Sequence, residues 1–183
     1  MSLPAFEFQI RKSMVLLIIA LLLHGVLSAQ LTPQTLSEKV KVIFPGIPEE
    51  KKLPAGGSMF MYAKDTGTGY MAMGLDLSAM GITPEIVTAL GDVIWEQLKA
   101  GIPSQMGGVT IAKDQLIQFK GQSSLYLELD GSKSENEQFK GKKAFGYLFF
   151  LGSVLHQVMY LSASPDAKAD DAAPFFNSVE ITR

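Results

Sequence analysis

His156 is the side chain with the clearest potential for chemistry, because the sequence has no cysteine and its only other histidine is His24. A neutral imidazole could serve as a general base for a nearby serine or as a metal ligand. However, His156 lies between Val154 and Val158 in a run that alternates as a β-strand does, whereas active-site residues favour loops held by a scaffold. We interpret His156 as a structural residue and keep a hydrolase-type enzyme using His156 as the alternative hypothesis.

The other polar patterns match no catalytic, cofactor or metal motif. Ser123-Ser124 lies outside the G-x-S-x-G pattern of a nucleophile elbow. The glycines of 67–69 lack a following Gly-Lys-Ser/Thr, and a predicted strand follows where a phosphate loop requires a helix. Three acids near the C-terminus lack the spacing of a calcium loop: Asp166, Asp170 and Asp171. We therefore predict no catalytic residue, no cofactor and no metal site.

Methionine is concentrated in one short region of the chain. Its positions there are Met59, Met61, Met71, Met73 and Met80. Methionine fills irregular gaps in cores, and it also lines adaptable binding surfaces. We favour the interpretation as core, and the alternative is an apolar pocket or partner surface.

The N-terminal 29 residues have the three parts of a secretory signal peptide. A basic pair, Arg11-Lys12, precedes the apolar run Met14–Leu23, and the small residues Ser28 and Ala29 follow. The run is shorter than the ~20 residues that a membrane-spanning helix needs. We predict cleavage after Ala29 and a periplasmic or secreted protein, and the alternative is a membrane anchor formed by the uncleaved segment.

Composition favours one packed domain over residues 30–183. Apolar residues make up 47% of the chain and charged residues 19%, which is typical of globular proteins. The formal net charge is −2, and the basic residues are scattered apart from a cluster over 140–143. Binding to a phosphate backbone needs a concentrated positive surface, so nucleic acid is not an expected partner.

Periodicity and turn residues predict an antiparallel sheet with two main helices. Residues 30–37 are interpreted as a polar lead-in. Strands are predicted at 38–44, 59–64, 70–77, 109–119, 122–130, 144–151 and 154–161. One helix begins at Thr83-Pro84 and ends at Gly101, with Trp95 at the edge of its apolar stripe. A second helix opens at 164–166 and is interrupted by Pro174. Because the strand at 144–151 is apolar on both faces, we predict an α+β fold, a single-domain α/β/α sandwich with a central sheet of about seven strands.

Two short stretches stand near the two ends of the predicted domain. One is "VIFPGIP", with Phe44, Pro45, Gly46 and Pro48, and the other is "FFNSVEI", with Phe176, Asn177 and Ser178. Both resemble the PsbP-like family. Together with the order of elements, the resemblance covers most of residues 38–183. It implies an α/β/α sandwich that serves as a binding or scaffolding module without a shared active site. The family includes an extrinsic protein of photosystem II and Ran-binding import factors. Nothing in this sequence matches the cofactor sites of the photosystem, and a Ran-binding role does not fit behind a signal peptide.

These observations lead to one expected function. We expect an exported, non-enzymatic binding or scaffolding module that engages a protein partner or a small apolar ligand. Membrane contact is expected only through the uncleaved signal segment.

If the signal peptide is cleaved, the mature protein lacks residues 1–29. Intact-mass measurement on protein recovered from the native host should therefore give the mass of residues 30–183. A mass that includes the first 29 residues would contradict cleavage and would favour the anchor.

Overall fold

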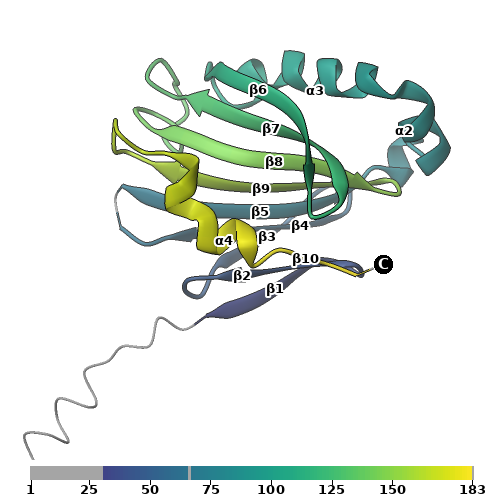
Figure 1. Ribbon diagram of the computed structural model, residues 1–183, viewed down its shortest axis with the longest axis horizontal. Helices are drawn as coiled ribbons and strands as arrows, with labels where there is room; N and C mark the ends of the chain where they lie inside the picture. Colours follow the sequence, from purple (N-terminus) through teal and green to yellow (C-terminus); the bar gives the residue numbers. More distant parts are fainter. Residues whose placement is uncertain (1–30, 66, 183) are drawn as a thin grey trace, which may run out of the picture. The chain divides into compact units, whose positions relative to one another are not determined.

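In the computed structural model, which describes residues 31–65 and 67–182, most strands that are adjacent in the sequence pair as antiparallel hairpins (Figure 1). The main sheet has seven strands in the order β3-β4-β5-β9-β8-β7-β6. In chain order they are β3 (Glu49–Lys52), β4 (Gly57–Ala63), β5 (Thr68–Asp76), β6 (Thr110–Phe119), β7 (Gln122–Asp130), β8 (Lys143–Leu151) and β9 (Val154–Ser162). The predicted α+β fold with a seven-stranded antiparallel sheet is confirmed.

A second, three-stranded sheet has the order β1-β2-β10. Its strands are β1 (Thr32–Ser37), β2 (Val40–Phe44) and β10 (Glu180–Ile181). The prediction of a polar lead-in over 30–37 is wrong in the described part, because residues 32–37 pair with β2 despite their polar sequence. The strand predicted at 38–44 begins at Val40 and belongs to this smaller sheet, so β3, a strand with no apolar residue, completes the main one.

The helical layer differs from the single helix predicted after Thr83. The Thr83 hydroxyl caps α2 (Pro84–Leu90) as expected, but Gly91 adopts a positive φ of 51° and separates it from α3 (Asp92–Gln105). Helix α3 also continues past Gly101 and contains Pro103, because the next turn places Ile102 in the core. A short 3₁₀ turn, η1 (Ser78–Met80), precedes α2.

The C-terminal helical segment begins later than the sequence predicts. Its first part is the 3₁₀ turn η2 (Ala169–Ala172), followed by α4 (Ala173–Asn177). Pro174 lies in the first turn of α4 and therefore does not interrupt a helix. A first-turn proline loses no helical hydrogen bond, which explains why the predicted break is wrong.

Two apolar cores lie on opposite faces of the main sheet. Helix α3 contributes Ile94, Trp95 and Ile102 to one core, in which Trp95 packs against Phe150 and is only 6% exposed. Trp95 is thus a core residue, where the sequence suggested an edge. The other core lies under the three-stranded sheet and α4, which cover the opposite face (Figure 1). Strand β8 contributes to both cores, as its two apolar faces predicted.

The two stretches that resemble the PsbP-like family meet in space. The backbone N–H of Ile43 donates to the Ser178 hydroxyl at 3.0 Å, although 135 residues separate them in sequence. The Ser178 hydroxyl also lies 2.7 Å from the carbonyl oxygen of Phe175. Phe175 in turn packs edge-on against Phe44, with 5.3 Å between the ring centroids. These contacts hold β2 against α4.

Phe44 is fully buried, so we expect Phe44→Ala to lower the free energy of unfolding by about 3–5 kcal/mol. Ile47 in the same stretch is 70% exposed, and Ile47→Ala is the matched control, with an expected change under ~0.5 kcal/mol. Denaturant titration measures both values. Equal losses for the two variants would contradict a structural role for Phe44.

Candidate functional site

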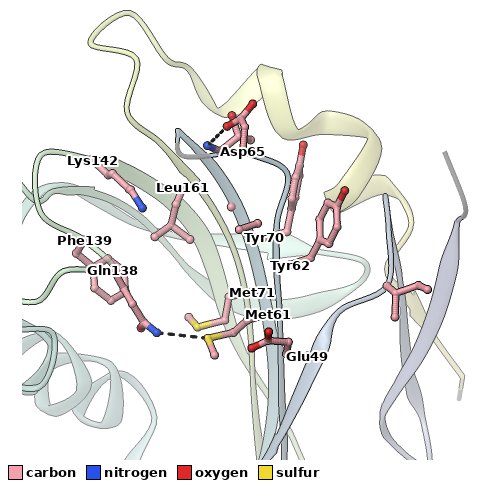
Figure 2. A pocket seen from close by; sticks show the side chains of 14 residues that line it. Glu49, Met61, Tyr62, Asp65, Tyr70, Met71, Gln138, Phe139, Lys142 and Leu161 are labelled. Carbon is pink, nitrogen blue, oxygen red and sulfur yellow. Dashed lines mark hydrogen bonds between the residues drawn. The ribbon is translucent and has the colours of Figure 1, made fainter. Parts of the chain in front are cut away.

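A cavity of about 390 Å³ lies where β4 turns into β5, beside the loop that joins β7 to β8. Its apolar wall is formed by Met61, Met71, Phe139 and Leu161 (Figure 2). Ligand sites in proteins have volumes of roughly 300–1,000 Å³ and are mostly apolar with a few polar groups. The size and lining of this cavity therefore fit a small ligand.

The β4–β5 turn is fixed by Asp65. Its carboxylate accepts hydrogen bonds from the backbone N–H groups of Gly67 and Thr68, each at 2.8 Å. These two backbone bonds hold the pKa of Asp65 below its ordinary value. Gly67 accordingly belongs to a hairpin turn, as predicted, whereas Thr68 and Gly69 already begin β5 and line the cavity.

The β7–β8 loop is held in a fixed shape by backbone contacts at Gly131. The N–H of Gly131 donates to the carbonyl of Lys142 at 2.8 Å, and its own carbonyl accepts from Gly141 at 2.9 Å. A Cβ at Gly131 would overlap the carbonyl of Phe139, so only glycine fits. This closure presents Phe139 and Lys142 to the cavity.

Polar side chains also line the cavity, and they differ in their partners. Gln138 reaches from the loop to Met61, with its amide nitrogen 3.7 Å from the sulfur (Figure 2). Lys142 is half-buried, and its ammonium has neither an ion-pair nor a hydrogen-bond partner among residues 31–65 and 67–182. The two acids are Asp65, bonded as above, and the exposed Glu49. Lys142 thus supplies an unpaired positive charge.

Two tyrosines of the lining belong to an aromatic row on the other face of the sheet. Tyr62, Tyr70 and Tyr160 lie side by side on β4, β5 and β9, with ring centroids 6.2 and 5.5 Å apart. Partial burial raises the pKa of Tyr70. A Cβ at Gly46 would overlap the Tyr62 ring, which explains the glycine in "VIFPGIP".

His156 is fully buried and does not line the cavity. Its ring stacks on Phe149 with centroids 5.0 Å apart. Burial lowers the pKa of His156 to about 4, and a weak interaction with the backbone of Val154 offsets only part of that effect. The imidazole is therefore neutral near pH 7.

One polar partner of His156 could suggest catalysis. Its Nε2 lies 2.9 Å from the Ser37 hydroxyl, and Ser37 lines a groove of about 500 Å³. His156 itself is not part of that lining, and its Nδ1 has no well-aligned hydrogen-bond partner among the described residues. A catalytic pair needs both groups open to substrate and an acceptor that orients the base. Only the serine-to-histidine distance is present here.

The remaining sequence candidates separate clearly in space. Ser124 is fully buried and bonds the carbonyl of Gln122. Met61 and Met71 pack against the core and also line the cavity, so both interpretations of the methionines apply to them. Met80, at 66% exposed, belongs to neither.

Sequence reasoning missed Phe139 and Lys142. Both lie in a loop, and a loop sequence has no periodic pattern that would show that they face β4 and β5.

No group of three or more His, Asp or Glu side chains in 31–65 and 67–182 is placed to hold a metal ion. None of the helices in this part of the chain is long and apolar enough to cross a membrane.

The buried imidazole predicts a pH effect on stability. Below its ordinary pKa of 6.5 the unfolded chain binds a proton at His156 that the folded chain takes up only near pH 4. Folding stability should therefore fall between pH 6.5 and 4 by up to about 3 kcal/mol from this group. Urea titrations of wild type and His156→Gln measure the effect, since other groups contribute to both proteins. Parallel stability curves over this range would contradict it.

Comparisons with known proteins support the fold. No protein-family model matches the chain, and no curated protein matches its sequence significantly. The solution structure of cyanobacterial PsbP (CyanoP) from Synechocystis sp. PCC 6803 is similar, with a TM-score of 0.50 and 14% identity over 86% of this chain and 96% of that one.

Two further structures are similar at a lower level. A protein of unknown function from Pseudomonas aeruginosa has a TM-score of 0.44 and 11% identity over 72% of this chain and 92% of that one. A structure from Bacteroides thetaiotaomicron has a TM-score of 0.44 and 10% identity over 81% of this chain and 48% of that one. At such identities a likeness shows architecture alone. The likeness to cyanobacterial PsbP, a member of the family that the sequence resembles, shows that this chain has the PsbP-like fold.

Proposed function

We propose that the protein is an exported, non-enzymatic binding module that holds a small apolar ligand in the cavity at the β4–β5 turn. The cavity itself is the observation that carries this proposal, because its volume of about 390 Å³ and its Met, Phe and Leu wall match a ligand site. Export rests on the signal-peptide pattern of residues 1–29, which lies outside the described part of the chain.

Methionine supports an apolar ligand of variable shape. The flexible side chains of Met61 and Met71 can adjust to different ligand outlines. The neighbouring turn is held by hydrogen bonds to the Asp65 carboxylate, and the loop is held by backbone hydrogen bonds at Gly131. Walls that are already ordered before binding lower the ordering cost of binding.

The protein-partner alternative has a weaker basis. Exposed apolar side chains on the helical layer include Met80, Ile86 and Val93. Scattered exposed apolar residues are common on protein surfaces. A cavity with an apolar wall is a more specific feature, and we therefore favour a small ligand.

A hydrolase that uses His156 is the second candidate, and its support is the 2.9 Å distance between Nε2 and the Ser37 hydroxyl. A base with a pKa near 4 is mostly unable to hold a serine proton at neutral pH. His156 is also fully buried, so a substrate that reached Ser37 could not contact the imidazole. These two facts make the binding module the better proposal.

The uncharged fluorescent probe N-phenylnaphthylamine tests the cavity directly. We expect saturable binding with a fluorescence increase in wild-type protein. Met61→Trp fills the cavity and should weaken binding by about tenfold or more, equivalent to ~1.4 kcal/mol.

Met59→Trp is the matched control, because Met59 is also half-buried, lies on the same face of β4 and is outside the lining. It should bind the probe as wild type does, and thermal unfolding would verify that both variants fold. Equal probe affinity in the two variants, or no saturable binding, would rule out the cavity as the ligand site.

A further inference from the structure

We propose that the ligand is an amphiphile with an apolar chain and one anionic head group, and that Lys142 binds the head group. This inference rests on the proposed function and adds the chemical class of the ligand. Its basis is the position of one unpaired cation, Lys142, beside the apolar wall of the cavity.

Lys142 differs from the neighbouring lysines in having no partner. Lys140 pairs with Glu137, and Lys143 donates to the carbonyl of Pro165. The Lys142 ammonium has no such contact within the described residues, although the side chain is half-buried and Figure 2 shows its nitrogen among the lining groups. An anion bound there would replace lost hydration with a charge-assisted hydrogen bond.

The acids of the lining are less suited to bind a cationic head group. Both Asp65 bonds go to backbone N–H groups of its own turn, so this carboxylate is already satisfied in place. Glu49 is exposed on the edge strand β3, opposite Met61 in register. Its charge is hydrated, and neither acid forms an ion pair with Lys142.

The apolar wall accounts for the other half of the ligand. Met61, Met71, Phe139 and Leu161 offer no hydrogen-bond donor to a polar chain. Each methylene buried against them adds to the binding affinity. Chain burial should set most of the affinity, and Lys142 should set the preference for charge.

Displacement of N-phenylnaphthylamine by three ligands of equal chain length tests this assignment. The ligands are decanoate, decanol and decyltrimethylammonium. We expect decanoate to bind about tenfold more tightly than decanol. The cation should bind most weakly. Added salt should weaken decanoate binding and leave decanol unchanged.

Lys142→Met should weaken decanoate binding by about tenfold and leave decanol unchanged. Lys142→Arg keeps the charge and should preserve the preference. Lys133→Met is the matched control, because Lys133 is an exposed lysine of the same loop outside the lining. It makes the same change in net charge and should have no effect on either ligand.

The outcomes separate this inference from the proposed function. Equal affinity for decanoate and decanol in wild type, or equal losses in Lys142→Met and Lys133→Met, would overturn the role of Lys142 while the apolar site stands. Preference for the ammonium ligand would assign the site to the acids and overturn it as well. Failure of N-phenylnaphthylamine itself to bind saturably would overturn the site as a whole.

Discussion

The close contact between β1 and the main sheet at Gly74 is the constraint on which the core under the three-stranded sheet depends. A Cβ at Gly74 would overlap the carbonyl of Leu36, so the two backbones meet where one strand has no side chain. Glycine permits such an approach at the cost of some strand stability. The contact brings β1 down onto the sheet, and β2 then buries Val40, Val42 and Phe44 completely. The same contact explains the hydrogen-bond partner of His156. This residue lies opposite Gly74 in register, and the approach of β1 brings the Ser37 hydroxyl to its ring.

A cavity remains at the other end of the same strands because the sheet is covered unevenly. Helix α3 contributes its buried residues to one face, and the three-stranded sheet with α4 covers the other. Near the β4–β5 turn, the face of the sheet that carries Met61 and Met71 is covered by the loop that carries Gln138, Phe139 and Lys142. A loop supplies fewer apolar side chains than a helix does, so space is left between the walls. The candidate site is therefore a direct result of which element covers which part of the sheet.

The sequence predicted the parts of the fold that have strong local signals. Alternation marked β7, the turn at Gly152-Ser153 marked the β8–β9 hairpin, and Thr83 marked the start of α2. It missed β1 and β3, because their residues are mostly polar and only pairing with neighbouring strands makes them extended. It also missed the break at Gly91, because the apolar stripe continues through it. For the site, methionine enrichment identified Met61 and Met71 as candidates. Lys142 could not be found, since its position depends on the backbone closure of a loop at Gly131.

The bond between Ile43 and Ser178 has a consequence for the order in which the chain folds. The segments that it joins are 135 residues apart, and closing a loop of that length carries a large entropic cost before any native contact compensates for it. Hairpins such as β8–β9 can form early because their partners are neighbours in sequence. Strand β2, in contrast, lacks its contacts with β10 and α4 until residues 173–181 are available. Final consolidation of the three-stranded sheet is therefore a late step, and an incomplete chain would retain an open, incompletely covered aromatic face.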